Sequence, residues 1–530
     1  MNRTTISLLA TATALAAITG LAALTAPSSG AETEAKAPAR LPVERSSLLC
    51  PAPSTSELAE TAYTSFTPAG KSGDAKDGAA KDGAAKDGTA ELKASAAVLA
   101  ETDAAPAKDK TKKGDAAKDA KGAKDAKKPA PDKAVLALKE PGKPVAAKAS
   151  GGEAPALVGT ATGRLAPGWS AQQTTTETAG DARGLLGVSC TGPDTDFWFP
   201  GASAAKERHD YVHLTNPDDT PAVADIELFG KDGALKTTLT EGIPVPAGAS
   251  VPVLLSTLTS DPAADLTVHV TTRTGRVGAV LRVADDKAGS DWLTASADPS
   301  GTAVLPGIPA DATSVRLVAF APGEDDADLT VQLAGPGGKI VPAGHETLHI
   351  KSGMTASVDL QDVTKGEAGS LILSPSQSGR ATPVVAALRV VRGKGDKQEV
   401  AFIPAAAPVG ERASVADNRA KGSTLSLTAP GAAAEVKVTA SAGTEGGTQV
   451  VKTYKVKAGT TLAVVPPVPA GLKGAYALTV ETVSGGPVHA SRTLALPKDG
   501  IPMFTVQTLP DDRGTVAVPE AEQDLSVLDD

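Results

Sequence analysis

Three short sequence blocks recur about every hundred residues along this 530-residue chain, and they constrain its fold more than any other feature. The first block is an apolar strand that ends in proline. It stands at 48–53 (LLCPAP), 197–202 (FWFPGA), 303–309 (AVLPGIP), 401–406 (AFIPAA) and 516–520 (VAVPE). The last four copies start 106, 98 and 115 residues apart. This period is too long for a propeller blade and matches a whole small β domain.

The two other blocks keep the same order within each period. One is a strand, a glycine turn and a second strand, in which we expect glycine to supply positive φ for a hairpin. Its copies centre on Gly248, Gly353 and Gly459. The other leads from a glycine turn into a strand with an arginine, which we interpret as a charge partner at a strand edge. Its copies contain Arg282, Arg389 and Arg492.

The sequence between these blocks has the chemistry of antiparallel strands. Val, Leu, Ile and Thr alternate with polar residues in segments such as 264–272 (ADLTVHVTT) and 434–441 (AEVKVTAS). We therefore predict an all-β fold of tandem immunoglobulin-like β-sandwich repeats, with a β-propeller or one continuous double sheet as the alternative. Because aromatic residues make up only 3% of the chain, Val, Leu and Ala must fill most of each interior, with Trp198 and Trp292 as large fillers.

The blocks and the changes in composition divide the chain into seven parts. Traces of the same blocks at 162–173 (TGRLAPGWSAQQ) and 185–190 (LLGVSC) indicate an additional, interrupted N-terminal unit. The predicted parts are a signal peptide at 1–31, a discontinuous N-terminal β unit at 41–70 plus 149–196, a disordered charged insertion at 71–148, β-sandwich repeats at 197–301, 302–400 and 401–510, and an acidic tail at 511–530.

The insertion at 71–148 is a low-complexity tract of Lys, Asp, Ala and Gly. It contains 18 lysines against 13 acidic residues, and almost no apolar residues that a core could bury. We predict that it is disordered and well solvated, apart from two short apolar islands at 94–100 and 134–138 that can form strands. It is either a neutral insertion, which its mixed charges favour, or a tether that touches an anionic polymer or lipid.

The first 31 residues have the pattern of a secretory signal. Arg3 precedes an uncharged apolar stretch, and small residues at 29–31 predict cleavage after Ala31. An uncleaved membrane anchor is the alternative, since the stretch approaches the length of a membrane span. Export would place the chain outside the cytoplasmic membrane, secreted or in the cell envelope, where Cys50 and Cys190 can form a structural disulfide.

Sequence motifs for catalysis and metal binding occur in the wrong context. The segment 345–349 (HETLH) has the spelling of a zinc protease, but the adjacent turn at Gly353 predicts a strand, where its two histidines would be too far apart for one zinc. The segment 209–213 (HDYVH) fails for the same reason, and the acidic loops at 216–221 and 323–328 have no counterpart in the next repeat. We predict no catalytic, cofactor or metal residues; a metal-dependent hydrolase is an unfavoured alternative.

The remaining candidate for ligand contact is the aromatic strand 197–199. Trp198 can either stack on sugar rings or pack at a domain junction, and its place in the recurring strand favours packing. A net charge of -9 excludes a general nucleic-acid binder. We expect a non-enzymatic scaffold or binding protein whose partner is a cell-wall polymer or an envelope protein. A carbohydrate-binding accessory protein is the alternative.

Several of these segments together resemble an uncharacterised family of actinomycete exported proteins, a domain-of-unknown-function family. The segments are the export signal, CPAP at 50–53, the Lys/Asp/Ala insertion, DFWFPGAS at 196–203 and the arginine-bearing strands, and the resemblance covers most of 41–510. It implies a location outside the cell membrane or in the envelope. It supplies no catalytic residues.

Overall fold

The computed structural model describes residues 39–70, 88–97, 133–180, 183–238, 241–377 and 381–518. The predicted signal peptide with Ala31 and most of the lysine-rich tract lie outside these ranges. Within them the chain has three single-turn 3-10 helices and no α-helix, and no helix that could span a membrane. The rest of the regular structure is β-strand, which confirms the predicted all-β class.

The chain divides into two compact units. In the described ranges the small unit is one pair of strands, β1 (Ala39–Pro42) and β39 (Thr515–Val518), with a hydrogen bond of 2.9 Å from the Arg40 guanidinium to the Thr515 hydroxyl. The predicted acidic tail at 511–530 therefore contains a strand. The large unit, Pro42–Gly514, holds all the other strands.

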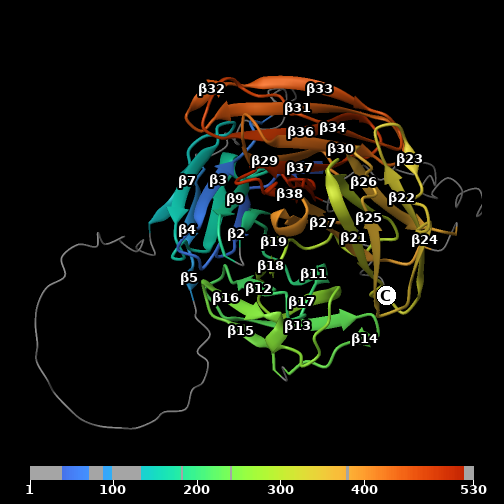
Figure 1. Cartoon of the computed structure of the whole chain (residues 1–530). Helices are drawn as coiled ribbons and strands as arrows, with labels where there is room; N and C mark the ends of the chain where they lie inside the picture. The colour runs from blue at the N-terminus through green and yellow to red at the C-terminus, as the bar shows by residue number, and fades with distance from the viewer. Residues whose placement is uncertain are drawn as a thin grey trace, which may run out of the picture. The chain divides into compact units, whose positions relative to one another are not determined.

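The large unit consists of four β-sandwiches (Figure 1), which we number in chain order. The first sandwich contains β2 (Arg45–Cys50), β3 (Glu60–Phe66), β4 (Ala90–Ala94), β6 (Ala134–Leu138), β7 (Val145–Ser150), β8 (Leu157–Thr162), β9 (Ser170–Glu177) and β10 (Gly184–Ser189). The second contains β11 (Asp196–Ala202), β12 (Tyr211–Thr215), β13 (Ala222–Gly230), β14 (Gly233–Ala234), β15 (Ile243–Val245), β16 (Ala249–Leu254), β17 (Leu266–Thr274), β18 (Gly278–Asp285) and β19 (Gly289–Leu293).

The third and fourth sandwiches follow without a break. The third contains β20 (Ala303–Ile308), β21 (Ala312–Phe320), β22 (Ala327–Ala334), β23 (Lys339–Ile340), β24 (Thr347–Ile350), β25 (Thr355–Gln361), β26 (Gly369–Pro375), β27 (Val385–Arg392) and β28 (Glu399–Pro404). The fourth contains β29 (Arg412–Asn418), β30 (Ser423–Ala429), β31 (Ala434–Gly443), β32 (Gly446–Thr448), β33 (Val450–Val456), β34 (Thr460–Val464), β35 (Ala470–Lys473), β36 (Tyr476–Gly485), β37 (His489–Ala495) and β38 (Phe504–Thr508).

All four sandwiches share one strand order. One sheet, which we call the A sheet, begins with the first strand of the sandwich: β2-β8-β4-β6, β11-β17-β13, β20-β26-β22 and β29-β36-β31-β33. The other, the B sheet, contains the second strand: β7-β3-β9-β10, β16-β12-β18-β19, β25-β21-β27-β28 and β34-β30-β37-β38. The recurring sequence blocks thus correspond to a recurring topology.

Small apolar side chains fill the interiors, as the composition requires. In the second sandwich, Phe197 and Phe199 point inward from β11 and meet Leu214 and Leu281 of the opposite sheet, while Trp198 between them points outward. This follows from the two-residue alternation of a strand. Trp292, the second predicted filler, is 2% exposed and packs with Leu186 and Val188 of the first sandwich, not inside its own.

The glycine turns differ from the predicted hairpins. Gly248, Gly353 and Gly459 have the expected positive φ, at 62°, 67° and 68°. However, the strands on either side of each turn belong to different sheets, so the turn takes the chain from the A sheet to the B sheet. A fourth copy that the sequence did not reveal stands at Gly142 in the first sandwich, with φ of 82°.

Two further predictions about strands were wrong. The proline-ended block at 401–406 does not begin a sandwich, because it lies in β28, which pairs with β27 as the last strand of the third. An apolar strand ending in proline suits either position. The arginine-bearing strands β18, β27 and β37 are not edge strands either, because each is hydrogen-bonded on both sides.

The predicted disordered insertion at 71–148 contains ordered strands at its described positions. Residues 90–94, 134–138 and 145–148 lie in β4, β6 and β7, and both sheets of the first sandwich need them. Leu92, Leu136 and Leu138 are buried there, which gives these short apolar islands their place in a core. The strand expected at 134–138 is confirmed. The segments 71–87 and 98–132 lie outside the described residues.

The last strands of the sandwiches contact one another in cyclic order. β10 contacts β19, β19 contacts β28, β28 contacts β38, and β38 contacts β10. Two buried carboxylates link these strands. Asp291 accepts from the Gly187 amide and the Thr505 hydroxyl, both at 3.0 Å, and Glu399 accepts from the Leu185 amide at 2.9 Å. The first sandwich thus contacts both the second and the fourth.

Candidate binding site

The A sheet of each sandwich faces the glycine turn of its neighbour in the cyclic order. The turn at Gly248 contacts the first sandwich, because the Gly248 carbonyl accepts from the Ala96 amide at 3.0 Å. Gly353 lies against Gly233 of the second sandwich, and Gly459 against Lys339 of the third. By the same rule, Gly142 of the first sandwich faces the A sheet of the fourth.

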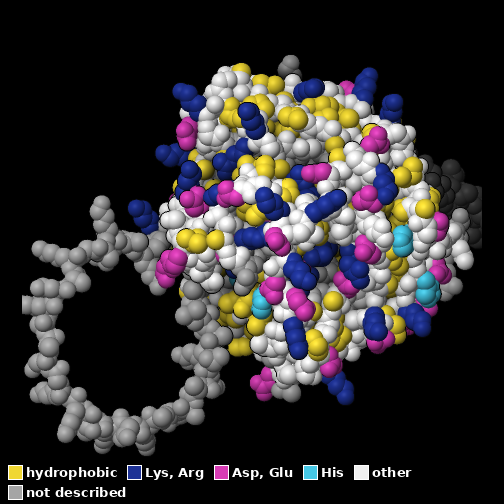
Figure 2. Space-filling view, viewed as in Figure 1, with side chains coloured by type: hydrophobic (Ala, Val, Ile, Leu, Met, Phe, Trp, Pro, Cys, Tyr) yellow, Lys and Arg dark blue, Asp and Glu magenta, His cyan; other side chains and the backbone are white. Residues whose placement is uncertain are grey.

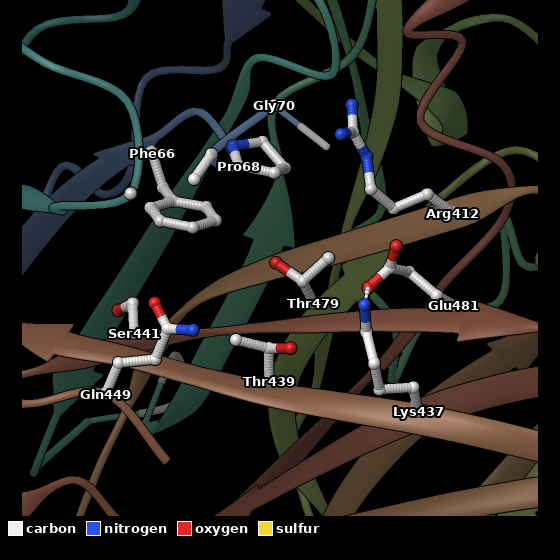
Figure 3. Close-up of a pocket in the computed structure, with 12 residues that line it drawn as sticks. Phe66, Pro68, Gly70, Arg412, Lys437, Thr439, Ser441, Gln449, Thr479 and Glu481 are labelled. Carbon is white, nitrogen blue, oxygen red and sulfur yellow. Dashed lines mark ion pairs between the residues drawn. The ribbon is translucent and has the colours of Figure 1, made fainter. Parts of the chain in front are cut away.

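At this last junction the two sandwiches leave a cleft, which we call the first cleft (Figure 3). Its volume is about 190 Å³. It is lined by Phe66, Pro68, Ala69, Gly70 and Gly142 of the first sandwich and by Arg412, Lys437, Thr439, Ser441, Gln449, Thr479 and Glu481 of the fourth. The first group forms its wall and the second its floor.

The floor of the first cleft is the outer face of strands β31 and β36. Lys437 lies directly opposite Glu481 in the strand pairing, and Thr439 opposite Thr479. Because every second side chain of a strand points to the same face, these four side chains form a polar patch, as Figure 3 shows. The Lys437 ammonium and the Glu481 carboxylate form an ion pair of 2.6 Å.

The wall of the first cleft is apolar but offers no exposed aromatic face. Phe66 is 2% exposed and packs against Ala416 and Ala477 of the fourth sandwich, so its ring closes the junction. Gln449, on the floor, is exposed. The cleft therefore offers hydrogen-bonding groups and not a stacking surface.

The second cation of the cleft is also neutralised. Arg412 donates from Nε to the Asp512 carboxylate at 2.6 Å and from Nη2 to the Pro167 carbonyl of the first sandwich at 3.3 Å. Burial raises the pKa of the Asp512 carboxyl, an effect that the adjacent Arg412 opposes. With both cations paired, the cleft has no uncompensated charge with which to attract a charged ligand.

Trp198, the predicted aromatic contact, lies outside the first cleft. It points outward from β11 and stacks on His269, with ring centroids 3.6 Å apart and planes at 8°. Its ring also lies 6.4 Å from that of Phe229 in the same sandwich and 5.3 Å from that of Phe320 in the third sandwich. Trp198 therefore lies at a junction between sandwiches. The role of this residue in ligand contact stays a prediction.

The two cysteines form the predicted disulfide. Cys50 ends β2 of the A sheet, and Cys190 follows β10 of the B sheet, so the bond joins the two sheets of the first sandwich. Both side chains are buried.

The zinc-protease spelling at 345–349 lies on a strand and not on a helix. His349 is in β24, and its Nδ1 contacts the Asp328 carboxylate at 2.7 Å. In the second histidine motif His213 is buried, and burial lowers its pKa to about 3, with the charge of Arg282 acting in the same direction. No cluster of three or more His, Cys, Asp or Glu residues with metal-binding geometry occurs among the described residues.

The acidic loops are occupied by protein contacts. Asp218 pairs with Arg276 at 3.0 Å, and Asp326 accepts from the Ser352 amide at 2.8 Å. These bonds occupy carboxylate oxygens that a calcium ion would need.

The floor residues of the first cleft were not identified from the sequence. The segments 434–441 (AEVKVTAS) and 476–485 (YALTVETVSG) show the alternation of strands, and their outward positions carry Lys, Thr and Glu. Such residues are ordinary on any solvent-facing strand. Only two features distinguish these residues from other solvent-facing strand residues. They are the register of β31 against β36 and the position of the first sandwich above them.

A model of a family of unknown function (DUF5719) matches residues 145–467, more than half of the chain. The match begins at the first residue of β7 and extends beyond β34, so it contains the floor residues Arg412, Lys437, Thr439, Ser441 and Gln449. No curated protein matches the chain.

Proposed function

The chain belongs to the DUF5719 family of unknown function, and from this premise we propose that it is a non-enzymatic binding protein of the cell exterior. Its first cleft binds a neutral, hydroxyl-rich polymer, such as a polysaccharide of the cell envelope. One observation supports this choice above others. The floor of the cleft presents hydroxyl, amide and paired ionic groups at the junction of two sandwiches, with the charges compensated inside the protein.

The chemistry of the lining favours a sugar ligand. Sugar hydroxyls both donate and accept, and the Thr439 hydroxyl, the Gln449 amide and the Lys437–Glu481 pair offer both donors and acceptors. A strongly anionic polymer would need unpaired cations, whereas Arg412 and Lys437 are already paired. Figure 2 shows cationic and anionic side chains interspersed over the face it draws, which likewise favours a neutral partner.

Binding suits the cleft better than catalysis does. A hydrolase needs an activated nucleophile or two carboxyl groups at a defined separation. The cleft lining contains one carboxylate, Glu481, which is paired with Lys437, and one serine, Ser441, whose hydroxyl donates to the Ala442 carbonyl. These groups hold and orient a ligand.

Location outside the cytoplasm is part of the proposal. The signal pattern at 1–31, the resemblance to exported actinomycete proteins and the Cys50–Cys190 disulfide support it, since disulfides persist in oxidising compartments. Sequencing the N-terminus of the protein recovered from the culture medium and from the envelope tests this. A start after Ala31 is expected, and a start at Met1 would favour the anchor.

Isothermal titration of the purified chain with a panel of tetrasaccharides of glucose, mannose, galactose and N-acetylglucosamine tests the function. We expect at least one to bind, and Thr439→Val and Gln449→Ala each to weaken it about tenfold, the value of one or two hydrogen bonds. Thr330→Val is the matched control, because Thr330 lies on the equivalent strand β22 of the third sandwich and does not line this cleft. Absence of binding across the panel would refute the proposal.

A further inference from the structure

The four junctions between sandwiches are equivalent in topology but not in packing. Between the second and third sandwiches the aromatic rings of Trp198 and Phe320 fill the space above the A sheet. Between the third and fourth, Val304 and Ile372 are buried, and the Ser370 hydroxyl bonds the Thr428 hydroxyl at 2.7 Å. The remaining two junctions, on either side of the first sandwich, contain open clefts.

The cleft between the first and second sandwiches, which we call the second cleft, has a volume of about 350 Å³. Its floor is the outer face of β4 and β8, and its wall is the turn at Gly248. Ser95 fixes this wall, because its hydroxyl donates to the Gly248 carbonyl at 2.9 Å. The lining residues are Thr89, Glu91, Lys93, Ala94, Ser95, Val158, Thr160 and Gly248.

The two clefts occupy the same place in the common strand order. Strands β4 and β8 of the first sandwich correspond to β31 and β36 of the fourth, and the turn at Gly248 corresponds to the turn at Gly142. Each cleft therefore lies on an A sheet, over the same pair of strands, beneath the glycine turn of the next sandwich.

The two clefts also share their chemistry. In the second cleft the Lys93 ammonium lies 3.9 Å from the Glu91 carboxylate. In the first cleft Lys437 and Glu481 likewise form an ion pair. Thr160 lies opposite Glu91 on the neighbouring strand and presents its hydroxyl to the same face. A compensated pair of charges and threonine hydroxyls on adjacent strands thus recur.

We infer that the second cleft is a second binding site for the same class of neutral, hydroxyl-rich ligand, so that the chain has two such sites on the two sides of the first sandwich. This inference rests on the proposed function of the first cleft, because the ligand class is carried over from it. A long polymer that engages both sites gains affinity over a short one through the raised effective concentration of the second.

The experiment is titration of the full-length chain with whichever tetrasaccharide of the panel binds, compared among single-cleft variants. Thr160→Val with Lys93→Ala weakens the second cleft, and Thr160→Trp blocks it by volume. In the first cleft, Thr439→Val weakens binding and Thr439→Trp blocks the cleft by volume. Lys148→Ala is the control for Lys93→Ala, because Lys148 is an exposed lysine on β7 of the same sandwich that lines neither cleft.

We expect two ligands per chain, one after blocking either cleft and none after blocking both, with circular dichroism unchanged. A stoichiometry of one that Thr439→Trp abolishes and Thr160→Trp leaves intact would overturn the inference while the proposed function stands. A single site that only Thr160→Trp abolishes would support the second cleft and refute the first. Absence of binding by any tetrasaccharide would overturn both.

Discussion

Arg389 of the third sandwich donates from Nη2 to the Asp285 carboxylate of the second at 2.8 Å, and both side chains are largely buried. The preceding junction repeats this relationship, since Arg282 of the second sandwich pairs with Glu177 of the first at 3.3 Å. In each pair the arginine lies on the same strand of the B sheet, and the acid stands at the end of that strand in the sandwich before. In two of its three copies, the arginine block of the sequence therefore supplies an ion pair that joins consecutive sandwiches.

The third junction breaks this series. The corresponding strand of the third sandwich, β27, ends in Arg392 and not in an acidic residue. Arg392 pairs with Asp311 at 2.6 Å. Arg492 of the fourth sandwich is fully buried, and none of its three side-chain nitrogens has a hydrogen-bond partner among the described residues. Burial lowers its pKa to about 10, although the nearby Asp417 opposes that effect.

We therefore predict opposite effects of the same substitution at two equivalent positions. Arg389→Met leaves Asp285 buried without its main cationic partner and should lower the free energy of unfolding by about 2 to 4 kcal/mol. Arg492→Met removes a buried guanidinium that donates no hydrogen bond among the described residues, and should raise that free energy by about 1 to 3 kcal/mol. Guanidinium chloride unfolding of both variants measures this. Equal losses in the two proteins would show that the hydrogen-bonded Arg389 and the unbonded Arg492 contribute alike to stability.

The junction of the last strands should make stability depend on pH. Burial raises the pKa of Glu399 from 4.5 to about 8, despite the Leu185 amide and the charges of Arg183 and Arg392, which lower it. The folded protein thus keeps this carboxyl protonated at pH values where the unfolded chain ionises it. Its contribution to stability is complete below about pH 4.5 and is lost as the pH rises through about 8.

Glu399→Gln should remove this part of the pH dependence. Glutamine keeps an oxygen that can accept from the Leu185 amide, at 2.9 Å in the native protein, but it cannot ionise. Thermal unfolding at several pH values between 5 and 8 measures the effect, which is about 1.4 kcal/mol per pH unit for one fully shifted group. The variant should lose less stability than the native protein over this interval. Parallel curves would contradict a buried, protonated Glu399.

The disulfide should stabilise the first sandwich in particular. Cys50 and Cys190 are 140 residues apart, and closing a loop of that length contributes about 5 kcal/mol in the chain-entropy model. We expect no titratable thiol in the denatured, unreduced protein. The double variant Cys50→Ala, Cys190→Ala should make residues of β2 and β10 exchange their amide hydrogens faster, while β31 in the fourth sandwich changes little. Uniform acceleration throughout the large unit would instead show that the sandwiches unfold together.

The fold could be predicted from the sequence where local chemistry determines it. Strand alternation and turn glycines give the all-β class, and the period near one hundred residues follows from copies such as FWFPGA at 197–202 and AVLPGIP at 303–309. Prediction failed where the same local sequence pattern is compatible with two different positions in the fold. A glycine with positive φ, such as Gly353, suits a hairpin and a crossing between sheets equally well, and the strand of 401–406 can end one sandwich as readily as it can begin another.

The candidate site depends on long-range geometry that no local pattern records. Thr439 and Thr479 are separated by 40 positions and become neighbours only through the register of β31 and β36. The wall of the first cleft comes from Pro68 and Gly142, at the other end of the large unit's sequence. The sequence identifies Trp198 as a large side chain in a recurring apolar strand, but its expected place as an interior filler was wrong, because the side chain points outward from β11. Whether that side chain meets a ligand or another sandwich depends on the neighbouring sandwich.

Trp198 provides the last prediction, because its environment favours packing over ligand contact. The indole stacks on His269 and faces Phe320 of the third sandwich, and neither cleft contains it. Trp198→Ala should lower the free energy of unfolding by about 2 to 4 kcal/mol, as for other large-to-small changes at packed sites, and should leave tetrasaccharide binding unchanged. Trp198→Phe, which keeps a ring in the stack, should recover part of the loss. If Trp198→Ala folds with native stability and no longer binds the tetrasaccharide, then this tryptophan is a ligand contact and the sites lie elsewhere than in the two clefts.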